Sequence, residues 1–210
     1  MSKVRLEFFS DGVFAIVCTL LAVGLEMPKF SERSDVLLAN LIAMSPSFMS
    51  YFLSFALVTL YWIAHHNLVA AVRVSNAAFT WLNSLFLMWF ALLPFPTDLM
   101  GHYPRNEIAV IFFGLVTLLA ALSFTTLRAF VYFRRDLQDP ELDRVQLRTS
   151  IRNGIVWIAV YACALLVSYA SNSITMTMYG LIPFLFLTPL RTRLRDVSVE
   201  RPNSIPLERS

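Results

Sequence analysis

Charged residues are scarce in this 210-residue sequence: Asp, Glu, Lys and Arg make up only 15% of it, where a soluble domain averages about 25%. Hydrophobic residues make up 57%, and the mean hydropathy is +0.63. Because so few charged residues cannot cover the surface of a soluble domain, the composition predicts an integral membrane protein. The apolar blocks are about as long as the ~20 residues that a helix needs to cross a bilayer.

Cysteine and glycine are also scarce. The two cysteines, Cys18 and Cys163, lie inside apolar blocks, which argues against a disulfide framework and favours small packing residues. The glycines form no nucleotide-binding pattern, Walker loop or nucleophile elbow, and no zinc-finger spacing is present. The sequence therefore predicts no catalytic residues, no metal site, no cofactor and no nucleic-acid partner.

Six membrane spans fit within residues 1–193, and a polar, loose tail is expected over 194–210. The second span is long, so we expect it to extend past the bilayer or to bend near Pro46, and the third should end before the breaker LLPFPTD. The predicted fold class is an all-α integral membrane protein with six transmembrane helices. The expected spans are 7–25, 36–68, 76–93, 107–133, 151–170 and 174–190.

The distribution of basic residues predicts the orientation of these spans. With the N-terminus inside, fourteen of the seventeen Lys and Arg residues fall on inner segments, and only Lys29, Arg33 and Arg105 fall on outer ones. Basic residues concentrate on cytoplasmic segments of membrane proteins. The bias therefore predicts that both termini are cytoplasmic.

The first span has two stripes when its residues are plotted at about 100° per residue. Small residues at four-residue spacing let another helix approach closely in lipid, so we expect the span to pack through the second stripe. The first stripe holds Phe9, Gly12, Ile16, Thr19, Leu20 and Val23. The second stripe, about 120° away, holds Asp11, Ala15, Cys18 and Ala22.

Asp11 is the one acidic residue in the apolar stretch FFSDGVFAI (8–16). A carboxylate at membrane depth is tolerated when it pairs with a base or accepts from backbone donors. Arg5 lies about 240° away around the same helix, so the two residues should reach different neighbours. Capping of the helix start by Ser10 or Asp11 is the alternative. His65 is a candidate partner of Asp11, or otherwise an interfacial histidine.

The motif Arg5-x-x-x-Phe9-Ser10-Asp11, continued by GVFAI, resembles the signature of the transmembrane protein 175 family of potassium channels. WIAHHNL (62–68) and LLPFPT (92–97) resemble the ends of the family's second and third helices. A single six-helix unit is similar to the prokaryotic members. The resemblance implies a homotetramer in the plasma membrane of a prokaryote, with potassium as permeant ion and membrane lipid as surroundings.

The resemblance also implies roles for particular residues, because the family's first helices surround a central pore. Carried over by position, Ile16 is the main apolar constriction, with Thr19 or Leu20 and then Val23 as further layers. A structural network at the inner end of the pore helix is implied for Arg5, Phe9, Ser10 and Asp11. His65 and Asn83 are its possible partners.

The expected function is therefore a passive cation channel with a modest preference for potassium and a hydrophobic gate. Two alternatives stay open. A proton- or cation-coupled secondary transporter would favour ionisable groups near the midplane and inverted repeats. A non-transporting membrane scaffold would account for helix packing alone.

Overall fold

The computed structural model describes residues 2–25, 34–140, 142–171 and 174–181, and these are almost entirely helical. The elements are α1 (Lys3–Val23), α2 (Ser34–Ala43), α3 (Ser45–Ala70), α4 (Ala77–Leu92), α5 (Pro94–His102), α6 (Glu107–Phe133), the 3₁₀ helix η1 (Arg135–Leu137) and α7 (Arg144–Ser168). Residues 174–181 are also helical.

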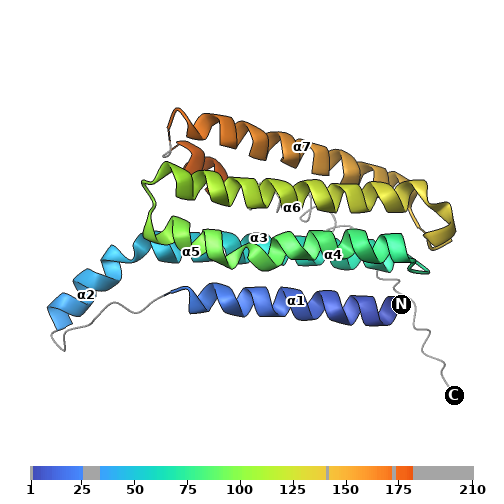
Figure 1. The fold of residues 1–210 in the computed structure, drawn as a ribbon, viewed down its shortest axis with the longest axis horizontal. Coiled ribbons are helices and arrows are strands. Elements are labelled where there is room, and N and C mark those ends of the chain that lie inside the picture. Colours follow the sequence, from blue (N-terminus) through green and yellow to red (C-terminus); the bar gives the residue numbers. More distant parts are fainter. Residues whose placement is uncertain (1, 26–33, 141, 172–173, 182–210) are drawn as a thin grey trace, which may run out of the picture.

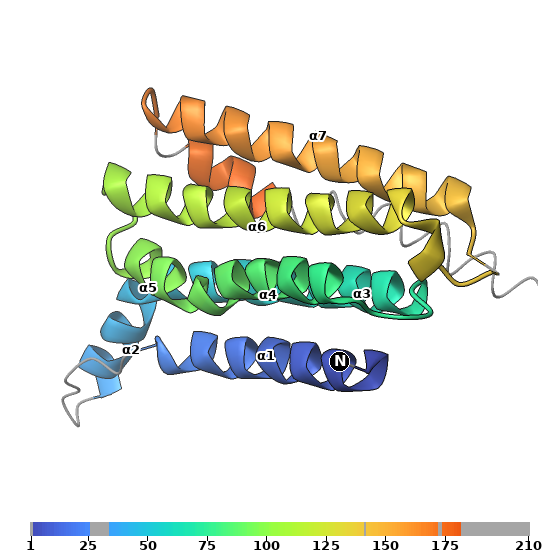
Figure 2. The ribbon, with the colours of Figure 1, turned by 45° about the vertical axis from the view of Figure 1, so that its right-hand side comes forward.

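The long helices lie side by side in a bundle (Figure 1). Helix α1 runs along one side, α3, α4 and α5 form the middle, and α6 and α7 lie on the other side, as the turned view also shows (Figure 2). Within the described part of the chain, five helical segments are long and apolar enough to cross a membrane: α1, α3, α4 with α5, α6 and α7. The expected sixth span, 174–190, lies largely outside the described residues.

Two features of the second and fourth expected spans are confirmed. Helix α6 covers Glu107–Phe133, the range predicted for the fourth span. The second span divides at Met44 into α2 and α3, and Pro46 stands in the first turn of α3. Proline is tolerated there because the first backbone N–H groups of a helix have no partner within it.

The predicted end of the third span is wrong. Helix α4 ends at Leu92, but α5 begins at Pro94 and continues to His102. Pro94 occupies the first turn of α5, so the proline that ends one helix also begins the next. The LLPFPTD segment therefore continues the helical path instead of ending it, because Leu93 between α4 and α5 also has helical backbone dihedrals.

Helix α1 begins earlier than the predicted span. Ser2 is its N-cap, and the Ser2 hydroxyl oxygen accepts from the backbone N–H of Arg5 at 3.4 Å. The alternative that Ser10 or Asp11 caps this helix is therefore wrong. Both residues lie inside α1, where their side chains are available to neighbouring helices.

An aromatic cluster forms the core between α1, α3, α4 and α6. Phe14 of α1 lies 5.4 Å from Phe90, measured between ring centroids, and Phe86 lies 4.7 Å from Phe124. Tyr61 of α3 contacts the same rings, at 4.9 Å from Phe90. Such tilted and stacked ring pairs contribute beyond the area that they bury. The cluster fixes which face of α1 points inward.

Candidate functional site

Helix α1 packs through a face of mostly large residues. The small-residue stripe is not this face: Ala15 and Ala22 are exposed, whereas Asp11 and Cys18 are half-buried. Within the described part of the chain, α1 therefore packs mainly through another face, and the small-residue stripe stays a predicted contact surface for a further helix. The Phe14 ring inserts between α3 and α4, with its centroid 5.5 Å from that of the His65 ring. Because this large side chain fits only between the two helices, it determines which face of α1 points inward. The buried residues of α1 are Leu6, Ser10, Phe14, Val17 and Leu21.

A chain of buried hydrogen bonds ties α1 to α4 and α3. The side-chain amide of Asn83 donates to Ser10 Oγ at 3.0 Å, and Ser10 Oγ donates to the Leu6 carbonyl at 2.9 Å. His65 Nε2 lies 2.7 Å from Asn83 Oδ1. Because the Asn83 carbonyl oxygen only accepts, His65 Nε2 carries the proton in this bond. All three side chains are buried, and each has a defined donor or acceptor role.

Asp11 is held by a different residue of α3. The indole Nε1–H of Trp62 donates to Asp11 Oδ1 at 2.9 Å. The structure therefore places His65 against Asn83 and Trp62 against Asp11. Trp62 was missed by sequence reasoning, although it precedes His65 by three residues and so shares its face of α3. The nearby pair Glu7 and His66 is looser, with 3.8 Å between Oε1 and Nδ1.

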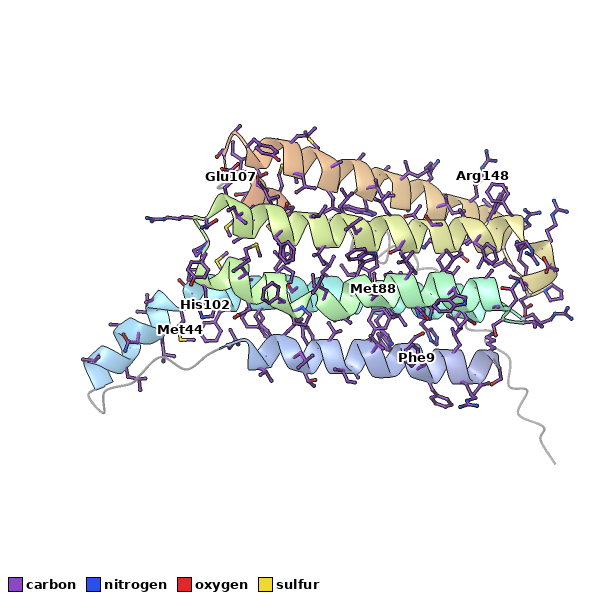
Figure 3. All side chains as sticks on the ribbon, viewed as in Figure 1. Phe9, Met44, Met88, His102, Glu107 and Arg148 are labelled. Carbon is purple, nitrogen blue, oxygen red and sulfur yellow. The ribbon has the colours of Figure 1, made fainter. Side chains whose placement is uncertain are left out.

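The described residues of this chain leave the opposite face of α1 uncovered. Ile16 is 59% exposed and Val23 is 73% exposed, and Leu20 and Phe9 are also exposed. Figure 3 shows the side chains along this edge of α1 pointing away from the bundle. Thr19 lies on the same face, and its hydroxyl donates to the Ile16 carbonyl at 2.8 Å. One face of α1 is thus anchored, and the other is apolar and open.

Arg5 and Phe9 belong to the open face in this chain. Both side chains are exposed, and the backbone N–H of Arg5 donates to the Ser2 hydroxyl oxygen. The motif therefore divides: Ser10 and Asp11 contact neighbouring helices, while Arg5 and Phe9 point away from them.

Comparison with known proteins assigns the family. The family described as endosomal/lysosomal potassium channel TMEM175 matches residues 5–94. A potassium channel of Chryseobacterium sp. (strain P1-3) is 31% identical over 191 residues, which cover 90% of this chain and 94% of that protein. The chain belongs to the TMEM175 family.

Further TMEM175 proteins agree in fold. The crystal structure of a homologue from Chamaesiphon minutus, described as a lysosomal potassium-selective channel TMEM175 homolog, superposes with a TM-score of 0.79 at 26% identity and covers 88% of this chain and 96% of its own. The rat endosomal/lysosomal proton channel TMEM175 is 34% identical over 212 residues, 89% of this chain but 41% of the rat protein. The chain is thus a multi-pass membrane protein and a cation channel, in a family of channels and not of enzymes.

Proposed function

We propose that this TMEM175-family chain is a passive channel with a modest preference for potassium, in the plasma membrane of a prokaryote. Its pore is enclosed by the α1 helices of a homotetramer. The observation that carries the proposal is the open apolar face of α1, from Phe9 to Val23, on a helix whose other face is fixed by Ser10 and Phe14. An anchored helix with one open apolar face fits a pore lining, because the anchoring keeps the same residues facing the pore axis.

A single chain does not enclose an axis with one helix face. Closed symmetric assembly is the usual way in which identical subunits surround a central axis. Four copies of α1 would bring four Ile16 side chains together at one level, with Leu20 and Val23 forming further layers. The exposed small residues Ala15 and Ala22 leave room for the neighbouring copy.

Selectivity in such a pore comes from the water shell of the ion. A narrow apolar ring thins this shell, and potassium gives up its water at lower cost than sodium. The preference is modest because no cage of oxygens replaces the lost water, and such rings also gate by dewetting. Thr19 adds a polar layer: its hydrogen is engaged by the Ile16 carbonyl, so its oxygen lone pairs are available to a cation.

The proposed orientation places the start of α1 in the cytoplasm. The loop after α3 and the loop after α6 lie at this same end, since Lys3 Nζ donates to the Ala70 carbonyl at 3.5 Å and Val72 pairs with Gln138. These loops carry Arg73, Arg134 and Arg135. The end of the bundle that gathers the basic residues is the cytoplasmic one by the positive-inside rule.

Proton passage is the second candidate. The rat relative, 34% identical, is named a proton channel. A hydrated apolar pore passes protons along a water chain without any acidic side chain on the pore face. Potassium and proton flux are therefore measured in the same preparation.

The test is potassium and sodium flux from liposomes that hold the purified protein. Wild type should pass potassium faster than sodium. Ile16→Asn should hydrate the ring and give faster or less selective flux. The matched control is Leu166→Asn, because Leu166 is 73% exposed on α7, a helix on the other side of the bundle from α1 (Figure 1). Leu166→Asn should leave both fluxes unchanged.

Three results would overturn parts of this proposal. Flux that saturates with potassium concentration indicates a transporter. A well-folded wild type that passes neither ion nor protons indicates a scaffold. Equal flux in wild type and Ile16→Asn removes Ile16 from the constriction while leaving the channel in place.

A further inference from the structure

A cavity of about 400 Å³ lies between α3, α6 and α7, away from α1 and its anchors. It lies toward the end of the bundle where α3 and α6 end and α7 begins. Its volume falls in the range of about 300–1,000 Å³ that is usual for sites of small ligands. The polar side chains that line it are Asn67, Arg128, Gln146, Thr149, Ser150 and Asn153.

Arg128 is the charged residue of this lining. It is only 7% exposed and lies five residues before the end of α6, which is about 7.5 Å along a helix. Its guanidinium carbon lies 4.1 Å from the centroid of the Phe124 ring, and Nη1 donates to the Ser150 carbonyl at 3.2 Å. These contacts hold the guanidinium at the wall of the cavity.

Among the residues that the structure describes, no Asp or Glu forms an ion pair with Arg128, and the ion pairs join other residues. A buried, unpaired cation at membrane depth is costly. A guanidinium has five N–H donors in a planar fork, and within the described residues one of them donates to a protein oxygen, the Ser150 carbonyl. Arg128 also lines the cavity, which is large enough for a ligand.

We propose that this cavity binds a phosphate-bearing anion, and that the anion is the headgroup of a phospholipid such as phosphatidylglycerol. The arginine fork matches two phosphate oxygens at once. The amides of Asn67 and Asn153 and the hydroxyl of Ser150 offer further donors around it. Basic pockets between transmembrane helices near the cytoplasmic surface are a recurrent setting for anionic headgroups.

The apolar part of the lining favours a lipid over a free ion. Leu60, Ile63 and Leu68 of α3 lie in the same cavity wall, and apolar walls suit the glycerol and the start of an acyl chain.

This site is independent of the pore proposal, because it is built by α3, α6 and α7 and not by the face of α1. The test is native mass spectrometry of the full chain in detergent, with phosphatidylglycerol and with phosphatidylcholine of the same acyl chains. Wild type should bind phosphatidylglycerol about tenfold more tightly than phosphatidylcholine, because one hydrogen-bonded charge pair contributes about that much affinity. Arg128→Gln should remove this preference.

The matched control is Arg135→Gln, which removes one positive charge from exposed η1 outside the cavity and should keep the preference. Equal binding of the two lipids by wild type, or an equal loss in both variants, would overturn the site. Excess inorganic phosphate should leave phosphatidylglycerol binding unchanged. If phosphate instead displaces the lipid and stabilises wild type but not Arg128→Gln in a lipid-free melt, the ligand is the free ion and the lipid assignment is wrong.

A second variant covers the case in which Arg128→Gln does not fold. Gln146 lines the cavity but is exposed, so Gln146→Trp places bulk there without disturbing the contacts of Arg128. This variant should melt like wild type and bind less phosphatidylglycerol. If it binds phosphatidylglycerol as wild type does, the lipid does not occupy this cavity.

Discussion

Asn83 of α4 donates its side-chain amide to the hydroxyl oxygen of Ser10 of α1 over 3.0 Å. This bond joins two helices that are 73 residues apart in sequence, in the interior of the bundle. This bond fixes the rotation of α1 about its own axis, because the Ser10 side chain must face Asn83 for the bond to form. The orientation of the open face of α1 is therefore set from the opposite side of the helix, by a buried polar contact.

Asn83→Leu should destabilise the fold by about 2–4 kcal/mol, since it leaves the buried His65 Nε2–H without its acceptor and the buried Ser10 oxygen without its donor. Thermal unfolding in detergent measures this loss. Asn67→Leu is the control, because Asn67 is exposed on α3 and should cost little. Equal melting of the two variants would show that the buried chain of hydrogen bonds contributes no stability.

The hydrogen bond between Trp62 and Asp11 should also couple their stabilities. A double-mutant cycle with Trp62→Phe and Asp11→Asn is expected to give a coupling free energy of about 1 kcal/mol, reduced from that of a buried charged bond because both side chains are partly exposed. The cycle is measured by unfolding in detergent. Additive single effects would mean that the 2.9 Å contact adds nothing in the membrane protein.

The sequence was informative where one strong pattern controls the structure. Helix α6 begins and ends at the predicted residues because Asn106 caps its start and a long apolar run follows. The break near Pro46 was predicted for the same kind of reason. The partner of Asp11 is predicted only in part. The sequence predicts contact with a neighbouring helix, but it does not single out the indole of Trp62, because a tryptophan near a span end also fits a lipid interface.

The inward face of α1 is hard to predict from the sequence because two packing rules compete there. Small residues at Asp11, Ala15 and Cys18 predict close helix approach, yet Phe14 occupies the space between α3 and α4 and decides the inward face. No single-helix plot contains the shape of that space. The predicted end of the third span is wrong for another reason, since a proline that ends one helix is equally suited to begin the next.

Gly101 allows α5 to lie close to α3. A Cβ at this position would lie 2.7 Å from Ser50 Oγ and 2.9 Å from the Ser47 Cα. Gly101→Ala should therefore destabilise the protein by about 1–3 kcal/mol through overpacking. Gly12→Ala is the matched control, because a Cβ there meets nothing within 4 Å and alanine favours the helix. Thermal unfolding of the two variants should move in opposite directions, and a loss at Gly12 alone would contradict this.

Thr19 offers the sharpest separation of stability from selectivity. Its hydroxyl donates to the carbonyl of Ile16 in its own helix, so no contact with another helix is lost in Thr19→Val, which keeps the shape of the side chain. Unfolding should be unchanged. The ratio of potassium to sodium flux should fall, because the oxygen lone pairs on the open face disappear while the proposed apolar ring at Ile16 stays.

The control for this effect is Thr126→Val on α6, where the hydroxyl likewise donates to its own helix, to Leu122, and is exposed away from α1. It should leave the flux ratio unchanged. If Thr19→Val and Thr126→Val give the same ratio as wild type, the preference for potassium comes from the apolar ring alone. A rise in the ratio with Thr19→Val would mean that the hydroxyl helps sodium, because it replaces water more effectively for the more strongly hydrated ion.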